Sequence, residues 1–139
     1  LVPCVYGETG LDALLAETDV LVLLLPLTDA TRGLIDARRL AQLPAGASLI
    51  NFARGALIDD TALLATLDTG HLDHAVLDVF AHEPLPPKHP YWHHPRVTVT
   101  PHVSAPTPKA SAAPIAAANL RRYLDTGEIP AAVDRGRGY

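Results

Sequence analysis

The sequence has no methionine and only one cysteine, Cys4, among its 139 residues. A single cysteine cannot form an internal disulfide and supplies no thiolate cluster for zinc, so we expect a reducing, cytoplasmic setting. Because translation begins at methionine and this chain begins at Leu1, we expect it to be a piece of a longer protein.

Basic charge and long apolar runs are also scarce. The 11 Lys and Arg residues are outnumbered by 15 Asp and Glu, so the basic excess expected of a nucleic-acid-binding protein is absent. The longest apolar run, Val20 to Leu27, is interrupted by Pro26 and is too short to span a bilayer. With 48% hydrophobic residues, the composition is that of a globular protein, and we expect neither a nucleic-acid nor a membrane partner.

The sequence does contain helical patterns that alternate with short apolar runs. The apolar runs predict four strands, at residues 20–25, 47–51, 74–79 and 96–100. The helical patterns predict helices at about 11–15, at 37–43 after Asp36, after Asp59 or Asp60 up to Gly70, and at about 108–125. We expect Pro114 to kink the last helix or to delay its start. The first run lacks alternation, which is typical of a central strand buried on both faces.

Alternating strands and helices predict an α/β fold with an open parallel sheet. In such sheets, ligands bind beyond the carboxyl ends of the strands. In this sequence, each predicted strand is followed at that end by a short exit segment that contains polar residues, in some cases beside proline or glycine. The exits are Leu25 to Thr28, Asn51 to Gly55, Asp78, and Thr100 to His102. Their convergence predicts one binding site.

Arg54 and Gly55 make up the second exit. The guanidinium of Arg54 has the planar fork that holds a carboxylate bidentately, and Gly55 would let a ligand approach the backbone closely. The alternative is an ordinary surface arginine on a loop.

His102 is the candidate general acid, because imidazole exchanges a proton near neutral pH. Glu83 could orient that imidazole. The alternatives are a capping or partly buried histidine and a solvated loop glutamate. Asp78 has two open interpretations: it accepts a hydrogen bond from a cofactor amide, or it caps the following helix or turn.

Four histidines lie in one proline-rich loop: His82, His89, His93 and His94. Their spacing fits no zinc pattern and includes no cysteine, so we expect no metal. In the same loop, Trp92 is expected to be an aromatic lid or a packing residue rather than a stacking platform for nucleic acid.

Taken in order, these segments resemble the D-isomer-specific 2-hydroxyacid dehydrogenases over nearly the whole chain. The motifs that carry the resemblance are Leu24 to Thr28 with Thr31, Asn51 to Gly55 with Asp60, Leu77 to Phe80, His82 to Pro86, and Thr100 to Ser104. The loop around Trp92 and the ending Val133 to Tyr139 look most like the glyoxylate/hydroxypyruvate reductase A branch.

The resemblance implies a Rossmann-like domain and a role for each site residue. Arg54 would bind the substrate carboxylate and polarise the keto oxygen, His102 would donate a proton to that oxygen, and Glu83 would pair with His102. Trp92 would join Arg54 and His102 in contacting the substrate. Asp78 would hold the nicotinamide carboxamide, and the residues implied to bind NAD(P) are Leu25, Pro26, Leu27, Thr31, Ala53, Arg54, Asp78, His102 and Ser104.

The resemblance also implies what the chain leaves out. No Gly-x-Gly-x-x-Gly fingerprint is present, so residues 1–107 would be the later part of an NAD(P)-binding domain whose first half precedes Leu1. Residues 108–139 would be a crossover helix and tail that pack on an absent substrate domain. The branch favours NADPH over NADH, and the family usually forms homodimers through this domain.

The implied activity is the NAD(P)H-dependent reduction of a small 2-keto acid, of the glyoxylate or hydroxypyruvate kind, by the full-length protein. Two alternatives stay open: a catalytically inactive fragment that lacks the phosphate-binding half, and a partner-binding module on a dehydrogenase fold. The presence of Arg54, Glu83 and His102 together argues against the partner-binding module.

Overall fold

The computed structural model describes residues 10–129, 133, 134 and 136. The chain divides into two compact units, Leu1–Ser104 and Ala105–Tyr139. Of the ending from Val133 to Tyr139, which carried part of the resemblance, only residues 133, 134 and 136 are described. The assignment of residues 108–139 to a helix and tail that pack on a substrate domain stays a prediction.

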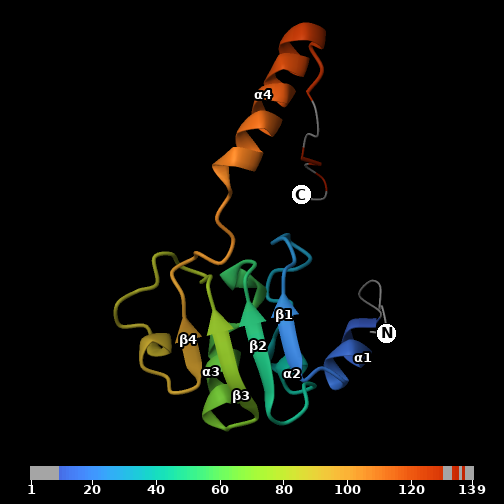
Figure 1. Ribbon diagram of the computed structural model, residues 1–139. Coiled ribbons are helices and arrows are strands. Elements are labelled where there is room, and N and C mark those ends of the chain that lie inside the picture. Colours follow the sequence, from blue (N-terminus) through green and yellow to red (C-terminus); the bar gives the residue numbers. More distant parts are fainter. Residues whose placement is uncertain (1–9, 130–132, 135, 137–139) are drawn as a thin grey trace. The chain divides into compact units, whose positions relative to one another are not determined.

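A parallel sheet of four strands forms the centre of the first unit (Figure 1). The strands are β1 (Val20–Leu23), β2 (Ala47–Asn51), β3 (Leu72–Leu77) and β4 (Val97–Val99). They lie in sequence order across the sheet, and every neighbouring pair is parallel. The predicted α/β fold with a parallel sheet is confirmed.

The helices of the first unit are α1 (Leu11–Ala16), α2 (Ala37–Leu40) and α3 (Asp60–Asp68). Asp36 caps α2 by accepting a hydrogen bond from the Arg39 N–H, and Asp59 caps α3 in the same way. Helix α2 is shorter than the predicted 37–43. The Ala41 N–H still donates to the Ala37 carbonyl, but Gln42 and Leu43 continue only as tight i→i+3 turns. Pro44 keeps the helix from extending past this turn, since the residue before a proline avoids the helical conformation.

The second unit contains helix α4 (Lys109–Thr126), which ends at Gly127 with φ of 72°. The helix runs through Pro114, so the expectation of a delayed start is wrong. A proline this close to the N-terminus removes a single backbone hydrogen bond, which an 18-residue helix tolerates. None of the residues of α4 is buried.

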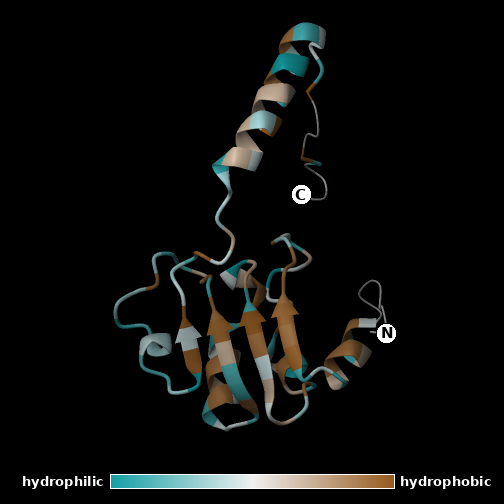
Figure 2. Ribbon diagram, in the orientation of Figure 1, coloured by the Kyte–Doolittle hydropathy of each residue, from teal (hydrophilic) through white to brown (hydrophobic). Residues whose placement is uncertain are grey.

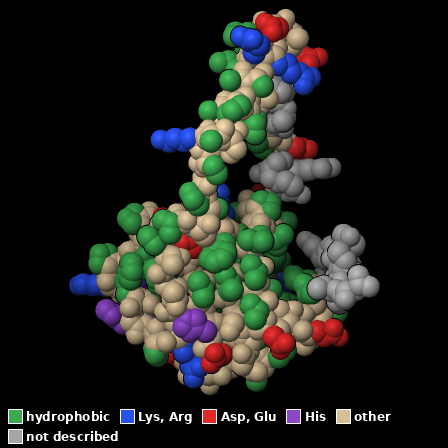
Figure 3. All heavy atoms as spheres, in the orientation of Figure 1, with side chains coloured by type: hydrophobic (Ala, Val, Ile, Leu, Met, Phe, Trp, Pro, Cys, Tyr) green, Lys and Arg blue, Asp and Glu red, His purple; other side chains and the backbone are tan. Residues whose placement is uncertain are grey.

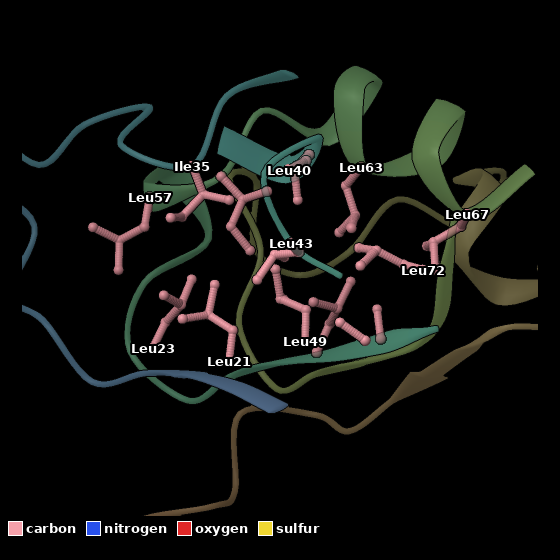
Figure 4. Packing of buried hydrophobic residues seen from close by; sticks show 14 of the residues in the cluster. Leu21, Leu23, Ile35, Leu40, Leu43, Leu49, Leu57, Leu63, Leu67 and Leu72 are labelled. Atoms are coloured by element: carbon pink, nitrogen blue, oxygen red, sulfur yellow. The ribbon is translucent and has the colours of Figure 1, made fainter. Parts of the chain in front are cut away.

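The core of the first unit lies between the sheet and the segment containing α2 and α3 (Figure 4). Leucine side chains of β1, β2 and β3 point toward leucines of these helices and of the turn after α2, and the labelled ones are Leu21, Leu23, Leu49, Leu72, Leu40, Leu43, Leu63 and Leu67. Burying one such side chain stabilises the fold by roughly 1.5–3 kcal/mol.

Strand β1 differs from its prediction. Val20 and Val22 are 54% and 46% exposed, whereas Leu21 and Leu23 are buried, so within the described residues β1 is an edge strand with one buried face. Hydrophobic side chains gather over the strands on the face seen in Figure 3, and β1 is hydrophobic along its whole length in Figure 2. An apolar run alone does not distinguish a strand covered on both faces from one covered on a single face. The prediction of a doubly buried strand is therefore wrong for the described chain.

Candidate active site

The carboxyl ends of the four strands lie side by side. Leu23 is in register with Asn51, Asn51 with Leu77, and Leu77 with Val99. The residues that follow these positions therefore leave the sheet at one edge, as the predicted site requires. The loops that carry Arg54, Glu83 and His102 all start from this edge or return to it.

Asn51 shapes the loop that presents Arg54. Its side chain is 1% exposed, its Nδ2 donates to the Arg54 carbonyl at 3.0 Å, and its Oδ1 accepts from the Ala53 N–H at 3.0 Å. The Arg54 side chain leaves this closed turn toward solvent, with one guanidinium nitrogen 2.6 Å from the Ala53 carbonyl oxygen. Sequence reasoning placed Asn51 at the strand exit but assigned it no role. Its position after an apolar strand was the available signal.

Gly55 has a different function from the one predicted. A Cβ atom at this buried position would overlap the backbone of Phe80 and Ala81. The glycine therefore allows the Arg54 loop and the segment before Glu83 to touch backbone to backbone. The prediction that Gly55 makes room for a ligand is replaced by this packing role, because its open side is filled by the protein itself.

Glu83 and His102 form the ion pair at the centre of the site. Oε2 of Glu83 lies 2.8 Å from Nδ1 of His102, and Oε1 accepts a hydrogen bond from the Phe80 N–H at 2.9 Å. The Phe80 N–H is the main cause that lowers the pKa of Glu83 below its usual 4.5, followed by the hydrogen bond to His102. Burial opposes the shift, and the charges of His102 and Arg54 add to it. The structure thus joins two of the predicted catalytic residues, Glu83 and His102, directly, and Arg54 lies near enough for its charge to lower the pKa of Glu83.

Because the Glu83 carboxylate is ionised at neutral pH, it can only accept hydrogen bonds. His102 must then carry a hydrogen on Nδ1, and its Nε2 is the ring atom left to exchange a proton with a substrate. The side chains of His102 and Glu83 are 51% and 38% exposed, so small molecules have access to the pair.

Asp78 directly follows β3 and is fully buried. Its oxygens accept hydrogen bonds from the Thr100 hydroxyl, the Val103 N–H, and the N–H and hydroxyl of Ser104. Burial alone would raise the pKa of Asp78, but the bonds from Ser104, Thr100 and the two N–H groups outweigh it and lower that pKa. These bonds anchor the turn after β4, from Thr100 to Ser104, and not the helix or turn that directly follows Asp78, so the predicted capping role is wrong in its target. Contact with a cofactor amide stays a prediction.

Trp92 lines a cavity of about 440 Å³ together with Glu83 and His102. The other lining residues are apolar: Phe80, Pro84, Leu85, Val99 and Pro101. The indole N–H donates to the Pro86 carbonyl at 2.9 Å, and the side chain is 47% exposed. The neighbouring Tyr91 is buried and donates its hydroxyl to Asp60 of α3 at 2.9 Å, which ties the loop to the core.

The residues predicted to line a dinucleotide lie at the ends of β1 and β2. Leu25 is 45% exposed there, and Phe52, which was not among the predicted residues, is 38% exposed beside Ala53. Thr31 donates its hydroxyl to the Pro26 carbonyl at 2.7 Å and closes the turn that contains Leu27. Ala53 is buried, with its N–H bonded to Asn51. These contacts shape the predicted surface, and dinucleotide binding by each residue stays a prediction.

Two of the four loop histidines have separate partners. His94 contacts Asp68 at 3.2 Å, and His89 accepts from the Tyr91 N–H. No group of three or more metal-binding side chains occurs among the residues that the structure describes. In the same part of the chain, no helix has the length and apolarity needed to cross a membrane.

Comparison with known proteins identifies the domain. A family model described as the NAD-binding domain of D-isomer-specific 2-hydroxyacid dehydrogenases matches residues 4–104. The chain belongs to this family. Its parallel sheet with flanking helices is accordingly part of a Rossmann-like NAD-binding domain, and NAD(P) is the cofactor class that the family supports.

Solved structures of similar dehydrogenases cover nearly the whole chain. A D-isomer-specific 2-hydroxyacid dehydrogenase from Xanthobacter autotrophicus Py2, in complex with NADPH and MES, is 46% identical with a TM-score of 0.92; the match covers 98% of this chain and 56% of that one. An NADPH-dependent glyoxylate/hydroxypyruvate reductase from Sinorhizobium meliloti, in complex with NADP and sulfate, is 38% identical with a TM-score of 0.88 over 96% and 44% of the two chains. The chain thus spans about half the length of these relatives.

Proposed function

We propose that this dehydrogenase domain is part of a reductase that converts a small 2-keto acid into the 2-hydroxy acid, with NAD(P)H as the reductant. Glyoxylate and hydroxypyruvate are examples of such acids. The observation that carries the proposal is the 2.8 Å pair of Glu83 and His102, with Arg54 close enough for its charge to affect Glu83. This trio lies at the carboxyl edge of an NAD-binding sheet. The name of the Sinorhizobium meliloti relative supports the choice of substrates.

The exposed apolar side chains at the strand ends fit the flat rings of a dinucleotide. Leu25 and Phe52 offer apolar contact at the edge where polar groups also converge, which is the usual composition of a cofactor site. Pro26, Leu27 and Thr31 would line the dinucleotide along the turn after β1, with Ala53, Asp78 and Ser104 nearer the reactive ring. When bound, the reduced nicotinamide supplies the hydride for the carbonyl carbon and is itself oxidised.

Arg54 and His102 would act on the keto acid from the protein side. The guanidinium of Arg54 would hold the substrate carboxylate and draw electron density toward the keto oxygen. Nε2 of His102 would give its proton to that oxygen, which leaves a neutral imidazole still bonded to Glu83 through Nδ1. Glu83 thereby holds the ring in one tautomer and one orientation. Trp92 would supply an apolar wall beside the substrate.

The finer assignments belong to the same proposal. We favour NADPH as the cofactor, since two of the similar structures contain NADPH or NADP. The full-length protein would be cytoplasmic and would form a homodimer. Sedimentation equilibrium of the full-length protein tests the dimer, for which a monomer mass would be the contrary result.

A spectrophotometric assay of the full-length protein tests the proposal. Oxidation of NADPH and of NADH at 340 nm is followed with glyoxylate, hydroxypyruvate and pyruvate at neutral pH, and the product is identified by chromatography. We expect NADPH oxidation with one of the first two acids and equal formation of the 2-hydroxy acid. Absence of turnover with every acid and both cofactors would favour the catalytically inactive alternative.

A further inference from the structure

We propose that Asp78 and Thr100 are positioning residues for His102. They hold the turn from Thr100 to Ser104, and so they fix the direction in which the imidazole points. The inference rests on the proposed reduction, in which His102 is the proton donor. It assigns to Asp78 a role directed at the protein itself, in addition to the predicted contact with a cofactor.

The acceptor capacity of Asp78 is fully used by this turn. Oδ1 accepts from the Thr100 hydroxyl at 2.6 Å and from the Val103 N–H at 2.9 Å. Oδ2 accepts from the N–H of Ser104 at 2.9 Å and from its hydroxyl at 2.6 Å. An ionised carboxylate has about four acceptor sites. All of them are therefore directed at residues that flank His102.

His102 needs such support because of its backbone conformation. Its φ of 53° lies in the left-handed region, which side chains other than glycine seldom adopt without help from their surroundings. Thr100 is held on one side of His102, and Val103 and Ser104 are held on the other. The anchored turn maintains the unusual conformation, and that conformation places Nδ1 at 2.8 Å from Glu83.

The anchoring is reciprocal. Asp78 is fully buried, and no cation pairs with it among the described residues, so the donors of this turn are what make its burial tolerable. Conversely, the N–H groups of Val103 and Ser104 have this hydrogen-bond acceptor only while the carboxylate stays in place. Loss of one hydrogen bond should therefore loosen the turn without unfolding the domain, because the core contacts of β3 and β4 remain.

Thr100→Val in the full-length protein is the decisive variant, because it removes one hydroxyl and keeps the branched shape. We expect kcat for keto-acid reduction to fall about tenfold, which corresponds to the loss of one hydrogen bond to a charged group. KM for NADPH and for the keto acid should change less than kcat, because Thr100 itself is assigned to neither binding surface. Thr100→Ser restores the hydroxyl and should restore kcat.

Thr98→Val is the matched control. It lies two residues earlier on β4, and its hydroxyl bonds His74 at 2.8 Å rather than Asp78. We expect this variant to keep the wild-type kcat. A Thr100→Val enzyme with unchanged kcat, or one changed only in its KM for NADPH, would overturn the positioning role.

An NMR measurement separates failure of this inference from failure of the proposed function. In the wild type, the His102 Nδ1–H held by Glu83 should give a downfield, slowly exchanging ring signal. The signal should be lost or broadened in Thr100→Val and retained in Thr98→Val, whether or not the protein reduces a keto acid. An unchanged signal in Thr100→Val would contradict the inference even if the reductase activity is confirmed. If no keto acid is reduced but the NMR result is as expected, only the proposed reductase activity is rejected.

Discussion

Nδ1 of His102 lies 2.8 Å from Oε2 of Glu83, although 19 positions separate the two residues along the chain. The two loops that carry them start from neighbouring strands, β3 and β4, and meet beyond the carboxyl edge of the sheet. A second bond, from the Phe80 N–H, holds the other oxygen of Glu83. The Glu83 carboxylate is therefore held by the backbone as well as by the imidazole, and the pair forms a preorganised acid–base group.

Glu83→Gln should lower kcat of the full-length reductase by roughly ten- to a hundredfold, the loss expected for a hydrogen bond to a charged group. The amide oxygen can still accept from Phe80, but the neutral side chain no longer stabilises the positive imidazolium. Steady-state kinetics with hydroxypyruvate measure the change. Glu17→Gln, an exposed change on the segment after α1, serves as the control and should be neutral. Equal kcat for Glu83→Gln and wild type would remove Glu83 from the mechanism.

Arg54→Gln should raise KM for the keto acid and lower kcat, because it removes the cation for the substrate carboxylate and the group that polarises the keto oxygen. We expect kcat/KM to fall at least about a hundredfold, the scale of a lost bidentate charge-assisted contact. Arg38→Gln is the control, since Arg38 is exposed on α2 and pairs with Asp12 at the surface. A similar kcat/KM for both variants would show that Arg54 does not bind the substrate.

Gly55→Ala should destabilise the domain strongly. The added Cβ would overlap the backbone of Phe80 and Ala81, which cannot move as a flexible side chain would. We expect the free energy of unfolding to drop by about 3 kcal/mol or more in urea titration. Gly46→Ala is a useful comparison, because Gly46 has a φ of 87° but open space around it, and its cost should stay near 1 kcal/mol. Equal costs for the two variants would contradict the close approach.

The lowered pKa of Asp78 predicts a specific loss of stability in acid. A carboxyl group whose pKa is lower in the folded protein stabilises the fold above its unfolded pKa, and this contribution is lost as the pH falls toward the folded pKa. The contribution of Asp78 should thus be complete above about pH 3.8 and should fade below it.

Asp78→Asn is the variant that tests this loss. At neutral pH it should reduce the free energy of unfolding by about 1–3 kcal/mol, because an amide leaves at least one buried N–H unpaired. The difference from wild type should shrink as the pH drops below 3.8, as measured by denaturant titration at each pH. A difference that does not depend on pH in this range would mean that Asp78 is not ionised in the folded protein.

Much of the fold was predictable because local signals and tertiary packing agree. Asp59 caps α3, and strand β2 lies at its predicted residues 47–51. The contact of Glu83 with His102, which was one of two interpretations from the residues and was implied by the resemblance, is present in the structure. Strand β1 was predicted with less success, because the periodicity of an apolar run does not reveal what covers each face.

The misjudged roles share a cause. Gly55 was assigned contact with a ligand, yet the structure packs it against the backbone of Phe80 and Ala81. The hydrogen bonds of Asp78 to the turn after β4 were not foreseen either, while its predicted contact with a cofactor stays untested. Asn51 and Thr100 were missed as supporting residues for the same reason. Such contacts join residues that are far apart in sequence, and no spacing rule along one segment encodes them.

The most direct test of the central claim is the keto-acid reductase activity of His102→Ala in the full-length protein, measured beside the wild type. His82→Ala is the control, because His82 is exposed in the loop before Glu83 and has no proposed role in proton transfer. If His102 donates the proton, kcat should fall by about 10²- to 10⁴-fold in His102→Ala and stay near wild type in His82→Ala. Full turnover by His102→Ala would contradict the account.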